Sequence, residues 1–174
     1  VTEFGVDRNT FYGVPGRDFQ IAEETVATAR ATYEFDNGLT LTNTFRASES
    51  LNDYILTAPS SLIDNGSTNP EDWQAGLSFK SWNQETDVLA NVLELSGDAE
   101  FAGATHKFVF GLAASQEKIS KLGYSNLSSE DYEPPAGQRG CTVSVINPNP
   151  IGDGCWSGEA AQLGTEATST KVTT

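Results

Sequence analysis

The chain has 174 residues and a net charge of −14 at neutral pH, from 10 basic and 24 acidic residues. This charge repels phosphate backbones, which argues against nucleic acid as a partner, and it argues against a polybasic membrane anchor. No run of about 18 apolar residues occurs, so no transmembrane helix is expected. The sequence begins with Val1 and contains no Met, which we interpret as a processed or truncated N-terminus.

The first predicted element is a β-hairpin over residues 23–56, preceded by a loop or edge segment over residues 1–22. From Thr25 to Phe35 small apolar residues and aromatic residues alternate with polar ones, as in a strand with one apolar face. Asp36-Asn37-Gly38 follows, and Asn and Gly tolerate the positive φ values of tight hairpin turns. A second alternating run continues to about Ile55.

The rest of the chain is predicted as loop, strands and loop. Residues 57–72 are dominated by Pro, Gly, Asn, Asp and Ser and predict a loop. Residues 73–121 predict two further strands joined by a short turn at 102–105. Residues 122–174 show no sustained period and contain a Cys pair, so they predict one long loop.

The positions of the aromatic residues favour an outer-membrane β-barrel. Tyr33, Phe35, Phe101 and Phe108 lie beside the two short turns, and the long loops lie at the opposite strand ends. Aromatic girdles beside short turns, with long loops at the other end, are typical of such barrels. Four strands cannot close a barrel, since the smallest membrane barrels have about eight. The predicted fold class is therefore all-β: an antiparallel transmembrane β-barrel segment of about four strands, with an incomplete barrel.

The alternation assigns the two faces of the predicted sheet. Arg30 and Arg46 are expected to point into the barrel lumen. The small and apolar residues of the opposite face are expected to contact lipid, namely Ala27, Ala29, Ala31, Leu41 and Phe45.

Several short motifs resemble those of a known family. In chain order they are Asp7-Arg8, Phe11-Tyr12-Gly13, Arg17-Asp18, the run EFDNGLTLTN over residues 34–43, Arg46, the segment from Tyr54 to Pro59, and the later stretch FAGATHKFVFGLAASQEK over residues 101–118. As a set, spread over residues 5 to 125, they resemble the middle of TonB-dependent siderophore receptors of the catecholate type. Ala113 departs from that pattern, because the family often has an acidic residue after Gly-Leu.

The resemblance implies a role within a larger receptor. Such a receptor lies in the outer membrane of a Gram-negative cell, binds a ferric siderophore outside and passes it inward with energy delivered through TonB. The expected partners of this segment are membrane lipid, the remaining barrel strands, a plug domain and, through a missing N-terminal part, the TonB complex. No enzymatic activity and no cofactor are expected, the ferric siderophore being the transported ligand.

Cys141 and Cys155 enclose 13 residues of the C-terminal loop. An isolated pair in a loop of an exported protein predicts a disulfide that stiffens the loop. A metal site is not expected, because two thiolates without a nearby His or third Cys are incomplete, and His106 is the only histidine.

Loop aromatic residues are the best ligand-contact candidates, because catecholate ligands are aromatic and anionic. The candidate binding residues are Trp73, Trp82, Tyr124, Tyr132, Arg139 and Trp156, with Arg17 as a further cationic candidate. The plainer interpretation is that these rings pack the loops or sit at the outer membrane interface.

Two other functions remain open at the level of sequence. One is a secreted, soluble all-β module that binds carbohydrate or mediates adhesion and contains one disulfide. The other is a secreted hydrolase with paired carboxylates such as Asp72 and Glu85. The soluble module requires that the alternating apolar faces cover one another in a closed core.

Overall fold

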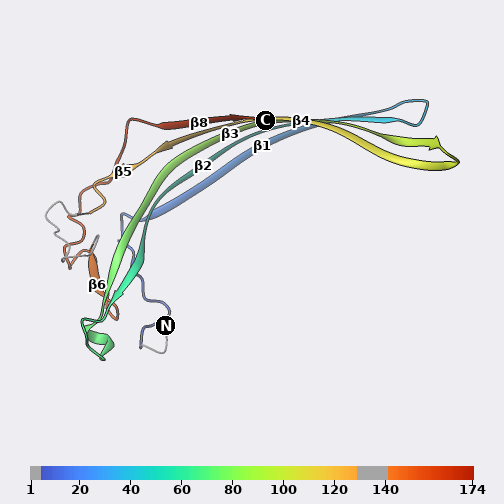
Figure 1. Ribbon diagram of the computed structural model, residues 1–174. Coiled ribbons are helices and arrows are strands. Elements are labelled where there is room, and N and C mark those ends of the chain that lie inside the picture. The colour runs from blue at the N-terminus through green and yellow to red at the C-terminus, as the bar shows by residue number, and fades with distance from the viewer. Residues whose placement is uncertain (1–4, 129–140) are drawn as a thin grey trace. The chain divides into compact units, whose positions relative to one another are not determined.

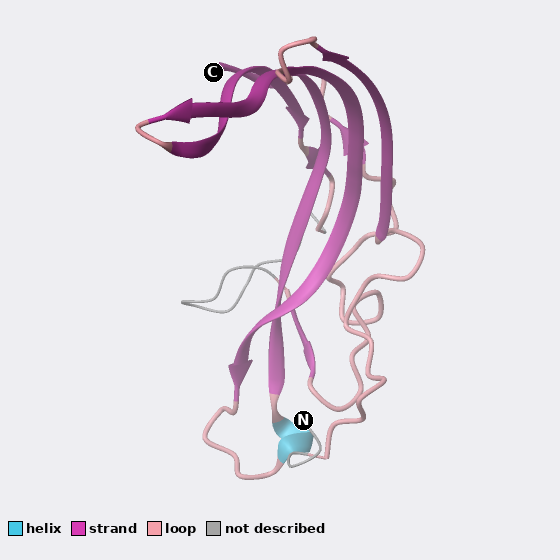
Figure 2. Ribbon diagram, turned by 90° about the vertical axis from the view of Figure 1, so that its right-hand side faces the viewer, coloured by secondary structure: helices cyan, strands magenta, loops and turns pink. Residues whose placement is uncertain are grey.

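The computed structural model describes residues 5–128 and 141–174. Four long strands dominate it: β1 (Phe19–Glu34), β2 (Thr40–Ile63), β3 (Gln74–Phe101) and β4 (Ala104–Leu122). They lie in one sheet in the order β1-β2-β3-β4, with β8 (Thr168–Thr173) next to β4. Figure 1 shows the four long strands following one another as successive hairpins. Figure 2 shows the same strands and one short 3₁₀ turn, η2 (Pro70–Asp72). Among the described residues, no helix is long and apolar enough to cross a membrane.

The two short turns lie where the sequence predicts them. At the first, the Phe35 N–H donates to the carbonyl of Leu39 at 2.8 Å, and Gly38 adopts a φ of 82°. At the second, Ala102 and Gly103 both have positive φ, 55° and 77°. Two successive positive φ values are the geometry of the type I′ hairpin turn, whose twist matches that of the flanking strands.

Strand ends differ from the predictions at several places. β1 begins at Phe19, inside the predicted loop or edge segment, and β2 continues to Ile63, seven residues into the predicted loop. The sequence misleads here because Pro and Ser usually indicate a break. Pro59 lacks only its own N–H, which a strand tolerates where that donor is not needed. The Ser60 hydroxyl donates to the carbonyl of Gly76 at 3.0 Å and so ties β2 to β3.

The C-terminal region is also more structured than predicted. It contains β6 (Thr142–Ser144), the pair β5 (Tyr124–Ser125) and β7 (Gln162–Leu163), and β8 (Thr168–Thr173). β8 pairs antiparallel with β4, from Gln116 opposite Thr173 to Lys121 opposite Thr168. The signal for β8 is the run TSTKVT, which is rich in β-branched residues but too short to show a clear period.

The contacts divide the chain into two units. The first, here called the loop unit, comprises residues 1–21, 52–83 and 122–167; the second, the strand unit, comprises residues 22–51, 84–121 and 168–174.

The loop unit has a small hydrophobic core. β6 pairs with the start of β3, with Ala75 opposite Val143, and extends this ladder by a bond from Leu77 N–H to the carbonyl of Cys141 at 2.6 Å. The disulfide between Cys141 and Cys155 lies in this core with both residues fully buried, and their Cα atoms are 5.3 Å apart. The predicted disulfide is therefore confirmed, and it anchors the C-terminal loop against β3.

The strand unit has no buried residue, and all of its residues are described. One face of its sheet carries large apolar side chains that are exposed to solvent, of which Leu112 is 74% exposed; the others include Phe45, Leu89, Leu93 and Phe110. On the same face Asn43 and Asn91 form a reciprocal amide pair. Each Nδ2 donates to the other residue's Oδ1, at 3.0 and 3.1 Å.

The opposite face of the strand unit is polar. Arg46 forms an ion pair with Glu24 at 3.8 Å, and Lys107 forms one with Asp98 at 3.9 Å. The Thr32 and Thr42 hydroxyls approach within 3.4 Å. These contacts agree with the predicted separation of an apolar and a polar face.

Candidate functional site

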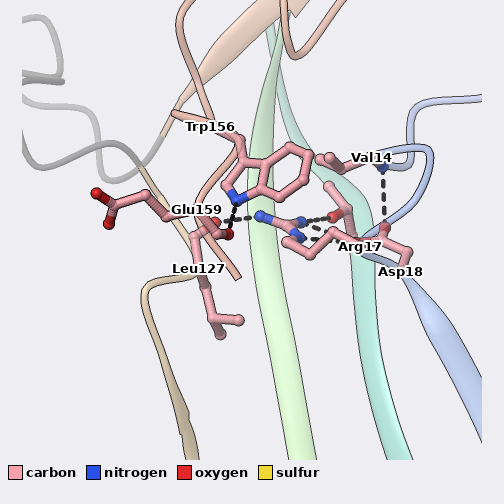
Figure 3. Close-up of polar contacts among 7 residues, drawn as sticks. Val14, Arg17, Asp18, Leu127, Trp156 and Glu159 are labelled. Carbon is pink, nitrogen blue, oxygen red and sulfur yellow. Dashed lines mark hydrogen bonds and ion pairs between the residues drawn. The ribbon is translucent and has the colours of Figure 1, made fainter. Parts of the chain in front are cut away.

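The best-defined polar site in the loop unit surrounds Arg17, which is only 5% exposed (Figure 3). Its Nε and Nη2 atoms donate to Asp18 Oδ1 at 3.0 and 2.9 Å. Nη2 also donates to the Thr57 hydroxyl, and Nη1 donates to the carbonyl of Leu127. One side chain therefore ties together the entry to β1, strand β2 and the chain that follows β5.

Aromatic rings cover the Arg17 guanidinium. Its Cζ lies 4.5 Å from the ring centroid of Phe79 and 5.9 Å from that of Trp156. Both are within the range in which the negative face of an aromatic ring attracts a cation. The Trp156 Nε1 donates to the carbonyl of Glu159 at 2.9 Å, which fixes the ring in place.

The Asp18 carboxylate is also occupied from the other side, because Oδ2 accepts the Val14 N–H at 3.1 Å. The Arg17 and Asp18 side chains are 1% and 9% exposed. An Arg whose donors are already used by the protein is poorly placed to hold a ligand anion. The structure therefore gives Arg17 a positioning role between loop segments.

Trp73 and Trp156 are both partly buried in the loop unit. The Trp73 Nε1 donates to the carbonyl of Ser67 at 2.7 Å, and its ring packs against the core. Trp156 covers Arg17, as described. Each ring thus has a packing partner in the loop, and its contact with a ligand stays a prediction.

Tyr124 and Trp82 are the other described candidates. The Tyr124 hydroxyl donates to Asp53 Oδ1 at 2.8 Å, and its ring meets Phe19 edge to face at 6.1 Å. Burial, followed by the Asp53 hydrogen bond and charge, raises the pKa of Tyr124 to about 12. Trp82 lies on β3 with 44% of its surface exposed. Tyr132 and Arg139 lie outside the described residues.

A surface cavity of about 540 Å³ lies in the loop unit beside Trp73, and we call it the Trp73 cavity. Its floor consists of buried core residues, and the rings of Tyr12 and Trp73 line it. The Tyr12 hydroxyl donates to the carbonyl of Val145, and burial raises its pKa. The Trp73 cavity includes residues from four segments: Val6, Asp7, Arg8, Thr10 and Tyr12; Pro59, Ser60, Ser61 and Leu62; Trp73 and Ala75; and Val145.

Metal-ligating side chains do not gather within the described part of the chain, where no three His, Cys, Asp or Glu residues are grouped. His106 approaches the carbonyl of Phe101 at 3.2 Å across the second hairpin turn. Asp72 Oδ2 accepts a bond from the Ser67 hydroxyl at 2.7 Å.

Comparison with known proteins relates this architecture to one class of receptor. Over 125 residues, 72% of its length, the chain is 27% identical to the probable TonB-dependent siderophore receptor PiuA of Acinetobacter baumannii. The chain is similar to part of a TonB-dependent siderophore receptor. This match spans 16% of PiuA, so the chain corresponds to a small portion of that protein. No family model matches the chain.

Solved structures show the same fold. The ferric-catecholate import receptor Fiu of Escherichia coli K12 superposes in its open form with a TM-score of 0.73, over 97% of this chain and 24% of Fiu, at 17% identity. Its closed form gives a TM-score of 0.63 over 83% of this chain and 19% of Fiu, at 20% identity. The predicted fold class, an antiparallel all-β segment of an incomplete receptor barrel, is thereby confirmed.

Proposed function

We propose that this chain is a barrel segment of an outer-membrane receptor that imports ferric siderophores with energy delivered through TonB. The observation that carries the proposal is the combined likeness in sequence and fold: 27% identity to PiuA over 125 residues, and the fold of Fiu over 97% of the chain. Both proteins are named as receptors. The chain spans less than a quarter of either, so binding and transport belong to the whole receptor.

The physical chemistry of the strand unit supports a membrane setting. Leaving a large apolar side chain exposed to water instead of burying it costs roughly 1.5–3 kcal/mol of free energy, and this unit exposes a row of such side chains on one face. Hydrocarbon would cover that row. The polar face, with Arg46, Glu24, Lys107 and Asp98, would line the lumen, where the plug domain of the complete receptor lies.

The soluble binding module is the less favoured alternative. A sandwich of this size buries apolar residues from two facing sheets. The buried apolar residues of the described chain all lie in the loop unit, and the strand unit has none. A module with this strand unit would expose its apolar face to water.

The first experiment compares the 174-residue chain, oxidised at its disulfide, in buffer and in detergent by analytical sedimentation. We expect aggregates in buffer that detergent disperses into β-rich particles. A sharp monomer of 18.6 kDa in plain buffer would contradict the membrane-segment proposal and favour the soluble module.

Transport is tested in a chimeric receptor. The portion of PiuA that matches this chain is replaced by the corresponding residues of this chain, and ferric-siderophore uptake is measured in cells that lack their own receptors. We expect uptake that disappears in a strain without TonB. A chimera that assembles in the outer membrane but takes up no iron would argue against the transport role of the segment.

A further inference from the structure

The apolar face of the strand unit contains a surface groove. It consists of two adjoining hollows of about 460 and 250 Å³, which share Leu89 and Gln116 and which we call the Leu89 groove. The large side chains of Leu89 and Phe45 in its lining are 47% and 44% exposed. Small residues provide much of the remaining apolar lining, namely Ala27, Ala47, Ala90 and Ala114. An apolar groove of this kind fits an extended hydrocarbon chain.

The groove leads from charged residues towards apolar ones. Side chains two residues apart on a strand share a face, so β3 gives the order along the groove: Asp87, Leu89, Asn91 and then Leu93. Asp87 and Lys118 both line the first hollow, whereas the exposed Leu93 lies beyond the second. A chain that enters beside the charged residues would therefore continue into the apolar part of this face.

The charges at this end of the groove are separated by sign. The carboxylates of Glu49 and Asp87 lie on β2 and β3, and the ammonium groups of Lys118 and Lys171 lie on β4 and β8. Lys118 is directly opposite Lys171, and like charges in that position repel, which favours an anion between them. Within the described part of the chain, none of these four side chains forms an ion pair.

A headgroup that matches these four side chains has a phosphate next to a primary ammonium. The phosphate oxygens accept N–H bonds from Lys118 and Lys171, and the ammonium donates to the carboxylates of Asp87 and Glu49. A headgroup with a phosphate and no cation would leave both carboxylates unmatched. A quaternary ammonium carries a positive charge but has no N–H to donate.

We propose that the Leu89 groove binds an aminophospholipid, with one acyl chain in the groove, the phosphate at Lys118 and Lys171, and the ammonium at Asp87 and Glu49. The location of the groove in a membrane rests on the proposed function, whereas the headgroup chemistry rests on these side chains alone. The site is more specific than general contact of the apolar face with hydrocarbon, because it selects one class of headgroup.

The test measures lipid binding to the 174-residue chain by native mass spectrometry from an uncharged detergent. Three lipids with identical acyl chains are compared: phosphatidylethanolamine, phosphatidylcholine with its quaternary ammonium, and phosphatidylglycerol, which has no cation. We expect phosphatidylethanolamine to bind about fivefold more tightly than either of the others, as one charged contact at a lipid headgroup implies. Equal binding of the three lipids would overturn the proposal.

Charge variants identify the residues that read the headgroup. Lys118→Gln should weaken phosphatidylethanolamine binding about fivefold, and Asp87→Asn should remove the preference over phosphatidylglycerol. Lys107→Gln is the matched control, because it removes an exposed Lys from the polar face of the same unit, and it should change neither quantity. Equal losses in Lys118→Gln and Lys107→Gln would overturn the assignment. Lys171→Gln should behave as Lys118→Gln does and replaces it if circular dichroism shows that Lys118→Gln has lost its β structure.

A second pair of variants tests the path of the acyl chain. Ala47→Leu narrows the groove without changing its charge and should weaken the binding of all three lipids. Ala31→Leu, on the same face but outside the groove, is its control, and equal effects of the two would contradict the acyl-chain path. The same spectra report oligomers. A dimer that lipid does not dissociate and that Ala47→Leu abolishes would assign the groove to a second copy of the chain and overturn the lipid site.

Failure of the lipid site is distinguishable from failure of the receptor proposal. A chain that detergent disperses into β-rich particles, but that binds the three lipids equally, would lack the site and leave the receptor proposal standing. A chain that is monomeric in buffer and still selects phosphatidylethanolamine through Lys118 would have the site and contradict the membrane-segment proposal.

Discussion

Replacing Arg17 by Met is the sharpest test of how the loop unit is held together. The substitution keeps a long apolar stem but removes four hydrogen bonds to Asp18, Thr57 and Leu127. It also leaves the Asp18 carboxylate, which is 9% exposed, with the Val14 N–H as its one remaining donor among the described residues. Breaking a buried ion pair in this way costs about 3–5 kcal/mol, whereas loss of a surface pair costs about 0–1 kcal/mol.

The assay is denaturant unfolding of the chain in detergent, followed by tryptophan fluorescence. Arg30→Gln, an exposed Arg with no such network, is the control and should shift the free energy of unfolding by no more than about 0.5 kcal/mol. Combining Arg17→Met with Asp18→Asn removes both charges. We expect this double variant to be more stable than Arg17→Met alone, because no unpaired charge stays buried.

Two outcomes would contradict the role assigned to the Arg17 network. If Arg17→Met unfolds at the same denaturant concentration as Arg30→Gln, with the same slope, the Arg17 network contributes no more than a surface ion pair. If the double variant is less stable than Arg17→Met, the cost arises from lost packing and hydrogen bonds and not from the orphaned carboxylate.

Three further predictions concern the membrane face, a titration and the disulfide. Ala29→Arg should reduce the folded, protease-resistant fraction in lipid vesicles far more than Thr28→Arg, since an Arg facing mid-bilayer hydrocarbon costs roughly 2–4 kcal/mol; equal losses would contradict the assigned faces. The Tyr124 phenol should titrate near pH 12, so its stabilising contribution is complete below pH 10 and falls as the pH rises towards 12. Asp53→Asn should lower that pKa, measured by phenolate absorbance. Reducing the disulfide should lower the free energy of unfolding of the loop unit by about 3 kcal/mol, measured by thermal unfolding. An unchanged melting curve would contradict this prediction.

Sequence patterns predicted the strand unit well because the signals that determine its strands and turns lie close together in the sequence. The Asn37-Gly38 turn requires positive φ, and alternation along each strand separates the apolar face from the polar one. Both signals lie within a few residues, so they can be recognised without knowledge of partners. The extent of β2 was harder to predict, because proline usually ends a strand. Proline is tolerated where the ladder does not need its missing N–H, and β2 continues through Pro59 to Ile63.

The loop unit could not be predicted in the same way because its contacts are distant in sequence. The bond from Arg17 to the carbonyl of Leu127 spans 110 residues, and that from Tyr12 to Val145 spans 133. Arg17 looked like a cation available to a ligand, and only its burial among protein acceptors shows otherwise. The Cys pair was the one long-loop contact that composition alone indicated.

The amide pair between Asn43 and Asn91 has a consequence for assembly. With this face of the strand unit in hydrocarbon, two carboxamides satisfy each other only when β2 and β3 are aligned as observed. Sliding one strand by two residues would still place apolar residues opposite apolar residues, but it would separate the two amides. Both would then lack hydrogen-bond partners, because hydrocarbon has no donors or acceptors. The pair therefore favours the observed register of β2 and β3 over a shifted register that the matching of apolar residues alone would allow.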